Sequence, residues 1–190
     1  MDPSHIHIHP GRGYFVPLPA MVSLPNGIRP GLEKLTLSQA VEELQGSGKT
    51  NWDLVESARS LVSERMHYSR RNSFEDASTA FERGYGFCQQ QSYALMKILN
   101  EVGVDAKVVQ AFRNKFPDGS TGGHAWVEVN MNGATWYIDT IFYDPETRMI
   151  EFSPLSPITD YSPLFRVVAG WGAAAINAHR FYLTGKDWDA

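Results

Sequence analysis

The sequence predicts an α+β fold, in which N-terminal helices pack on an antiparallel β-sheet. Helical periodicity dominates from residue 36 to residue 103, and β-branched and aromatic segments follow it as far as residue 142. Two of those segments flank Asn132-Gly133, a dipeptide that strongly favours a β-hairpin turn. With 190 residues, 43% hydrophobic and 20% charged, the chain is typical of one globular domain with extensions.

Three parts are expected along the chain. Residues 1–35, rich in Pro and Gly, predict an extended arm, residues 36–142 the core, and residues 143–190 a C-terminal extension packed on the same domain. A net charge of −4 argues against nucleic acid or an anionic membrane as a partner. Because the sequence shows neither a signal peptide nor an apolar run of about 20 residues, we expect a cytoplasmic protein.

Three helices are predicted before residue 85. Thr36 and Gln39 form a capping box at the start of the first. Asn51 is expected to cap the second, and the third is expected to start with Ser73 and Asp76 and to stop at Gly84. Apolar residues recur at helical spacing through the second helix: Trp52, Val55, Ala58, Leu61 or Val62, and Met66.

A fourth helix begins at Cys88, the only cysteine of the chain, and Gly103 follows its end. Its inner stripe comprises Gln91, Ala94 or Leu95, Ile98 or Leu99, and Val102. A cysteine is nucleophilic only as the thiolate, and the electropositive start of a helix lowers a thiol pKa. Cys88 is therefore a candidate nucleophile as well as a candidate small core residue.

The hairpin predicts a partner for this cysteine. A two-residue turn at Asn132-Gly133 places Trp126 opposite Asp139 and His124 opposite Ile141. Side chains alternate between the faces of a strand, so His124 and Asp139 share one face as diagonal neighbours, about 7 Å apart or less at Cβ. The other face receives a set suited to a core: Ala125, Val127, Val129, Trp136, Ile138 and Thr140.

These positions predict a separate catalytic role for each of the three residues. Asp139 would orient His124, His124 would take the proton of Cys88, and the backbone N–H of Cys88 would stabilise an oxyanion. The candidates for substrate contact or for the second oxyanion donor are Gln89, Trp52, Tyr68 and Trp126.

Three separated motifs resemble those of the transglutaminase-like superfamily, in that family's order: "GYGFCQQQSYALMKILNEVGVDAKVV", "GGHAWVEV" and "WYIDTIF". The resemblance covers about residues 51–142. It implies a papain-like catalytic core with Cys88 as nucleophile, His124 as base and Asp139 as orienting group. The family includes protein cross-linking enzymes, peptidases, amidases and members that have lost the triad. Small members similar to this chain are regarded as cysteine peptidases or amidases.

We therefore expect a thiol hydrolase that acts on a peptide, a protein or a small amide through an acyl-enzyme, without metal or organic cofactor. Alternatives are protein-glutamine acyl transfer to an amine and a non-catalytic binding module on the same fold. Acyl transfer from a cofactor thioester is less favoured, because the Arg-Gly-Gly approach of arylamine acetyltransferases is missing before Cys88.

Two other motifs resemble a phosphate-binding loop and a metal site, but their sequence context argues against both functions. "GSGKT" at 46–50 resembles the end of a phosphate-binding loop, but Glu43 occupies the position of the required first glycine and the preceding residues are helical. "HIHIH" would align His5, His7 and His9 along a strand, yet no acidic or cysteine partner lies near in the sequence. We expect a polar loop in the first case and an arm without metal in the second.

Overall fold

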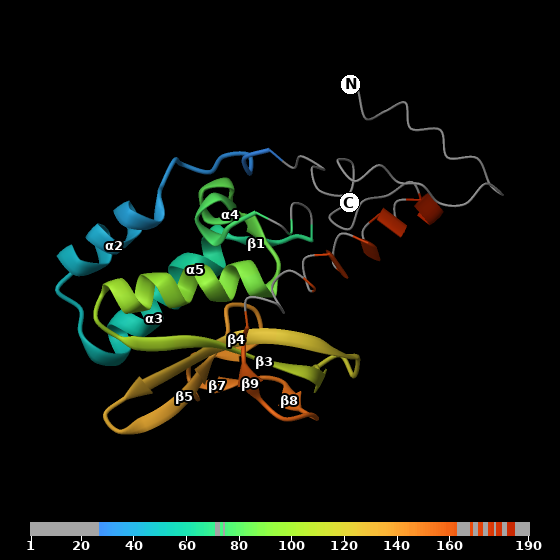
Figure 1. Cartoon of the computed structure of the whole chain (residues 1–190). Coiled ribbons are helices and arrows are strands. Elements are labelled where there is room, and N and C mark those ends of the chain that lie inside the picture. Colours follow the sequence, from blue (N-terminus) through green and yellow to red (C-terminus); the bar gives the residue numbers. More distant parts are fainter. Residues whose placement is uncertain are drawn as a thin grey trace.

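Helices and sheet form two layers in the computed structural model, with the helices along one face of the sheet (Figure 1). The structure describes residues 27–70, 73, 75–162, 168, 171–172, 175–176, 178–179 and 182–184. The predicted α+β class is confirmed. Most of the predicted N-terminal arm, with its three histidines, lies outside the described residues.

The helical layer contains the four predicted helices, α2 (Leu37–Gly46), α3 (Asn51–Arg65), α4 (Ala77–Arg83) and α5 (Cys88–Glu101). The capping box of α2 is present, with the backbone N–H of Gln39 donating to Thr36 Oγ1 at 3.2 Å. In α4, the Asp76 carboxylate caps the first turn, and Gly84 ends the helix with a φ of 80°. The prediction for α3 was wrong by one residue, because Thr50 rather than Asn51 precedes its first helical residue.

The sheet has the order β5-β4-β3-β8, and a further strand, β9, also pairs with β3. Its strands are β3 (Asp105–Lys115), β4 (Thr121–Met131), β5 (Ala134–Ile138), β8 (Ser153–Pro154) and β9 (Thr159–Asp160). All of the pairings are antiparallel. Two smaller pairs lie outside this sheet: β1 (His67–Tyr68) with β2 (Tyr85–Gly86), and β6 (Tyr143–Asp144) with β7 (Met149–Ile150).

The hairpin between β4 and β5 has the predicted register. Val127 pairs with Ile138, and the turn residues Asn132 and Gly133 have φ angles of 53° and 77°. Positive φ at both central residues is the type I′ condition that Asn-Gly meets at low cost. The register confirms that His124 and Asp139 belong to the same face.

Each face of the sheet covers its own apolar cluster. The face toward the helices buries Val127, Val129 and Ile138 against α2, α3, α4 and α5. The opposite face buries Trp126 with Phe152, which belongs to the segment after β7. Residues beyond 142 therefore cover the second face, and β8 and β9 extend the sheet.

No helix within the described ranges has the length and apolar content that crossing a membrane requires.

Candidate active site

Cys88 is the first residue of α5, at the end where the backbone N–H groups point outward. Gln90 fixes the start of this helix, because its Oε1 accepts from the backbone N–H of Phe87 at 3.3 Å and its Nε2 donates to the carbonyl of Glu75 at 3.1 Å. The short parallel pairing of β1 with β2 sets Tyr68 opposite Gly86, two residues before the cysteine. The Cys88 thiol is half-buried and unpaired with any other cysteine.

His124 and Asp139 meet across the hairpin as expected. His124 Nε2 lies 2.5 Å from Asp139 Oδ2, and the two residues are 6% and 2% exposed. Asp139 Oδ1 accepts from the backbone N–H groups of Ile141 at 2.6 Å and Phe142 at 2.9 Å. These bonds turn the chain directly after β5 and leave the other carboxylate oxygen for the imidazole.

The His124 imidazole and the Cys88 thiol both line one cleft, and they lie close enough for each to shift the pKa of the other. Because Nε2 of His124 is occupied by Asp139, Nδ1 is the ring nitrogen left to interact with the sulfur. The structure thus brings the three predicted residues together, from the start of α5, from β4 and from the turn after β5.

Aromatic rings enclose His124. Trp126 stacks nearly parallel to it, with ring centroids 6.2 Å apart and planes 20° apart. Three phenylalanines meet the imidazole edge to face: Phe116, Phe142 and Phe152, at 5.6, 5.8 and 5.0 Å. This apolar cage fixes the plane of the ring and lowers the local dielectric constant, which strengthens its interaction with Asp139.

The electrostatics favour an ion pair between thiolate and imidazolium. Burial acts to raise the pKa of Cys88, but the hydrogen bond with His124, the positive charge of that residue and the backbone N–H of Ala125 outweigh it and bring this pKa below its usual value. Burial likewise acts to lower the pKa of His124, and the charge and hydrogen bond of Asp139 overcome it and raise this pKa to about 10.

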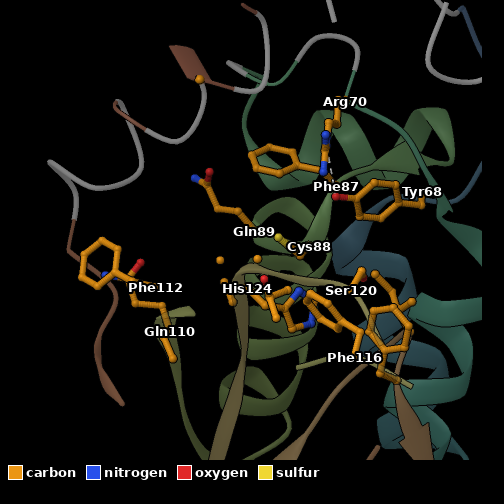
Figure 2. A pocket seen from close by; sticks show the side chains of 18 of the residues that line it. Tyr68, Arg70, Phe87, Cys88, Gln89, Gln110, Phe112, Phe116, Ser120 and His124 are labelled. Atoms are coloured by element: carbon orange, nitrogen blue, oxygen red, sulfur yellow. Dashed lines mark hydrogen bonds between the residues drawn. The ribbon is translucent and has the colours of Figure 1, made fainter. Parts of the chain in front are cut away.

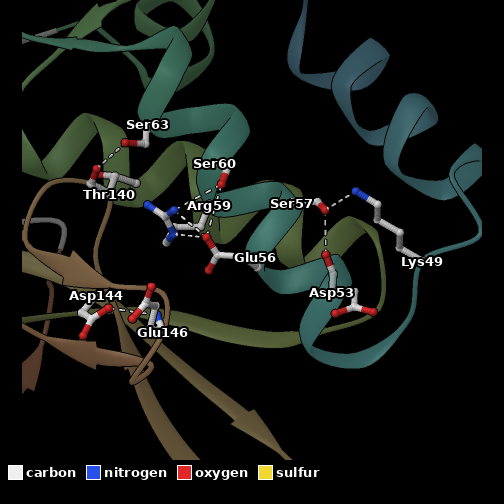
Figure 3. A network of polar contacts seen from close by, with 10 residues as sticks. All are labelled: Lys49, Asp53, Glu56, Ser57, Arg59, Ser60, Ser63, Thr140, Asp144 and Glu146. Carbon is white, nitrogen blue, oxygen red and sulfur yellow. Dashed lines mark hydrogen bonds and ion pairs between the residues drawn. The ribbon is translucent and has the colours of Figure 1, made fainter.

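A buried glutamine connects the helix that begins at Cys88 to the turn that follows Asp139. Gln91 Nε2 donates to the carbonyls of Met66 and Gly86, at 3.2 and 2.9 Å, and its Oε1 accepts from Thr140 Oγ1 at 2.7 Å. From α3, Ser63 Oγ donates to the carbonyl of Thr140 at 2.7 Å (Figure 3). Thr140 follows Asp139 directly, so these bonds set where the carboxylate lies relative to Cys88.

Replacing Gln91 with methionine is expected to lower the free energy of unfolding by about 2–4 kcal/mol, because the buried Met66 carbonyl and Thr140 hydroxyl would lose this partner. The Gly86 carbonyl would keep the backbone N–H of Ser69. Chemical denaturation of both proteins measures the difference. Gln45→Met is the matched control, since the Gln45 bond to the carbonyl of Glu101 is solvent-exposed, and its expected cost is below about 1 kcal/mol. Equal losses in the two variants would contradict the role assigned to Gln91.

A cleft of about 720 Å³ opens over Cys88 and His124 (Figure 2). Its lining is mostly apolar and aromatic, and Gly122 and Gly123 leave room beside the histidine. In Figure 2, Tyr68, Phe116 and Ser120 lie to one side of the thiol, and Gln89, Gln110 and Phe112 lie to the other.

Of the four other candidates, Tyr68 and Gln89 line this cleft. Trp126 and Trp52 do not, and the expectation that they contact substrate is corrected here. Trp126 is fully buried beside His124, and its ring packs in the apolar cluster that contains Phe152, on the face of the sheet away from the helices. Trp52 packs edge to face on Trp136, with centroids 5.0 Å apart, and Arg148 lies over its ring.

Sequence reasoning missed the three phenylalanines of the cage. Phe116 precedes β4, whereas Phe142 and Phe152 follow β5, and no periodic pattern relates them. Within the described residues, no cluster of three or more His, Cys, Asp or Glu side chains is arranged to hold a metal ion.

One family of known proteins matches more than half of the chain. The family model described as "Transglutaminase-like superfamily" matches residues 38–139. No curated protein matches the chain.

Similar solved structures include the periplasmic domain of TgpA from Pseudomonas aeruginosa, with 20% identity, a TM-score of 0.43, and 67% of this chain and 50% of that one covered. A candidate cysteine protease from Cytophaga hutchinsonii gives 14% identity, a TM-score of 0.44, and 66% and 48% coverage. A protein named as a TGase gives 19% identity, a TM-score of 0.45, and 55% and 30% coverage. The chain thus spans half or less of the length of these structures.

Proposed function

Because this chain belongs to the transglutaminase-like superfamily, we propose that it is a thiol hydrolase that cleaves peptide or amide bonds through an acyl-enzyme on Cys88. The observation that carries the proposal is the meeting of Cys88 and His124 in one cleft, with the Asp139 carboxylate 2.5 Å from one imidazole nitrogen and the thiol close enough to His124 for each to shift the pKa of the other. A buried cysteine that served only packing would not need a charged histidine beside it.

The proposed reaction has two halves. The Cys88 thiolate attacks the carbonyl carbon of the substrate, and the backbone N–H of Cys88 stabilises the resulting oxyanion. The C–N bond then breaks as His124 gives its Nδ1 proton to the departing amine, which leaves a thioester on Cys88. His124 next takes a proton from water, the hydroxide attacks the thioester, and the acid product and the thiolate separate.

Asp139 acts on these steps through His124. Its carboxylate keeps the Nε2–H pointing away from the sulfur, so that Nδ1 exchanges the proton with substrate. The negative charge also stabilises the imidazolium that exists before attack and again after deacylation. Every proton of the cycle is carried by side chains of the chain or by water.

Hydrolysis is the default outcome, because water enters an open cleft unless an amine excludes it from the thioester. Acyl transfer from a glutamine side chain to an amine uses the same first half of the reaction. The two outcomes differ only in which nucleophile attacks the acyl-enzyme.

Mass spectrometry of the intact protein tests the proposal. Incubation with a pool of casein peptides is expected to yield shorter peptides, together with an adduct on Cys88 when the reaction is quenched in acid. A parallel incubation with glutamine peptides and monodansylcadaverine reports transfer as a fluorescent product. Cys88→Ser, which keeps the shape of the side chain, is expected to lose at least about a thousandfold in rate.

Fluorescent product in excess of cleavage would replace hydrolysis by transfer. Cleavage that persists in Cys88→Ser would contradict the mechanism. An inert wild-type protein whose thiol also resists alkylation would favour the binding-module alternative.

A further inference from the structure

Three consecutive glutamines open α5 after the cysteine, and all three are buried: Gln89, Gln90 and Gln91 are 2%, 2% and 1% exposed. The amide oxygens of Gln90 and Gln91 accept hydrogen bonds from Phe87 and Thr140. Gln89 Oε1, in contrast, has no hydrogen-bond partner within the part of the chain that the structure describes.

Gln89 is also the only one of the three that lines the cleft. Its side chain extends from the helix start toward the side occupied by Gln110 and Phe112, away from Tyr68 (Figure 2). A buried carbonyl oxygen without a partner costs free energy, and the cost is recovered when a ligand supplies the missing donor. Because Gln89 directly follows Cys88, a ligand N–H that bonds its Oε1 would lie only a few bonds from the carbonyl that the thiolate attacks.

We propose, building on the thiol hydrolase function, that Gln89 Oε1 accepts a hydrogen bond from an N–H group of the substrate beside the scissile carbonyl. The site then distinguishes secondary amides from esters of the same shape, because an ester oxygen cannot donate. A site with a buried acceptor rejects an analogue that lacks the donor more strongly than an apolar pocket rejects a change of size. Gln89 is thus a specificity-determining residue for amide substrates.

The assignment is to an acceptor rather than to the second oxyanion donor. The atom that is buried without a partner is the oxygen, whereas an oxyanion would require an N–H from the side chain. The two roles predict different behaviour. An acceptor contributes only to substrates that carry an N–H, whereas an oxyanion donor assists amides and esters equally.

Two alkylating agents of matched shape test this proposal: N-benzyl-2-iodoacetamide carries the N–H, and benzyl iodoacetate has oxygen in its place. In both reactions the thiolate displaces iodide and forms a C–S bond. The second-order rate constants with Cys88 are divided by those with glutathione, which removes the intrinsic difference between the reagents. The benzyl group is chosen for the Phe112 side of the cleft.

After division by the glutathione rate constants, the rate constant of wild-type Cys88 with the amide reagent is expected to exceed that with the ester reagent by about tenfold. Gln89→Met removes the acceptor at similar volume and is expected to abolish the preference, whereas Gln89→Glu keeps an acceptor and is expected to retain it. Gln45→Met, on the exposed surface of α2, is the matched control and should behave as wild type.

Equal reagent ratios in wild type and Gln89→Met would overturn the proposal. Equal losses with both reagents in Gln89→Met would show that Gln89 donates to the carbonyl oxygen that the two reagents share, which is the atom that becomes the oxyanion during acylation, and would overturn the proposal as well.

Methyl methanethiosulfonate, a small reagent without an N–H, separates this inference from the proposed function. Rapid reaction in every variant shows that the thiolate is intact, so that an unchanged reagent ratio then counts against Gln89 alone. A wild-type thiol inert to that reagent near neutral pH would remove the basis of the hydrolase function and of the specificity with it.

Discussion

Alanine at position 124 is expected to slow the alkylation of Cys88 by iodoacetamide at least about a hundredfold at pH 6.5. In the wild type, the hydrogen bond and charge of His124 bring the pKa of Cys88 below its usual value despite burial. Without the imidazole, burial and the negative charge of Asp139 both act to raise that pKa. It would then exceed the usual value of about 8.5, which leaves less than about one thiol in a hundred ionised at pH 6.5.

The measurement is the alkylation rate as a function of pH between about 4 and 10. The wild-type curve should reach its plateau well below the usual thiol pKa, and the His124→Ala curve should still be rising above it. His67→Ala is the control, because His67 is an exposed histidine on β1 that makes its ring contact with Tyr85. Superimposable curves for wild type and His124→Ala would show that the thiol is not activated by this histidine.

Asparagine at position 139 is expected to reduce kcat/KM by about 10³ to 10⁴, with little loss of stability. The amide oxygen can still accept from the backbone of Ile141 and Phe142, so the turn after β5 is retained. The amide NH₂ would face His124 Nε2 and donate to it, which moves the imidazole proton to Nδ1. A neutral histidine with its proton directed at the sulfur cannot accept the proton of Cys88.

Nuclear magnetic resonance titration of the His124 ring gives a readout that a merely structural role would not move. Asp139 raises the pKa of His124 to about 10, so the variant should titrate several units lower, toward the usual value of about 6.5. The sign follows from charge: a carboxylate stabilises the imidazolium and a neutral amide does not.

Asp144→Asn is a matched control for this substitution. Asp144 also receives a backbone N–H in a turn, that of Glu146 at 2.9 Å, yet it lies on β6 and does not line the cleft. We expect its catalytic rate and its histidine titration to equal those of the wild type. An unchanged His124 titration in Asp139→Asn would contradict the orienting role of Asp139.

The hairpin is the part of the site that could be predicted most sharply from the sequence. Asn132-Gly133 specifies a two-residue turn, and alternation of apolar residues then allows one register only. A slip by one residue would move the apolar side chains into solvent, so the contact of His124 with Asp139 follows from local information. The beginning of α5 at Cys88 is local in the same sense.

Other features depend on contacts between distant segments. Tyr68 reaches the cleft through a two-residue parallel pairing, which is too short to leave a periodic signal. Trp52 lies on the apolar side of α3 as predicted, but that side faces Trp136 rather than the cleft. Trp126 shares a face with His124 as predicted, and residues beyond 142 turn that part of the face into core.

The hydrogen bond between Gln91 and Thr140 joins the helical layer to the sheet beside the active site. The reactivity of Cys88 therefore depends on how the two layers are packed together. The thiol belongs to helix α5, whereas the imidazole belongs to β4 and the carboxylate to the residue after β5. Any local opening that separates helix from sheet therefore deprives the sulfur of its cation before the rest of the chain unfolds. The reactivity of the Cys88 thiol thus measures how closely the helices pack on the sheet. A ligand that strengthens or weakens this packing is expected to change that reactivity before it changes other properties of the domain.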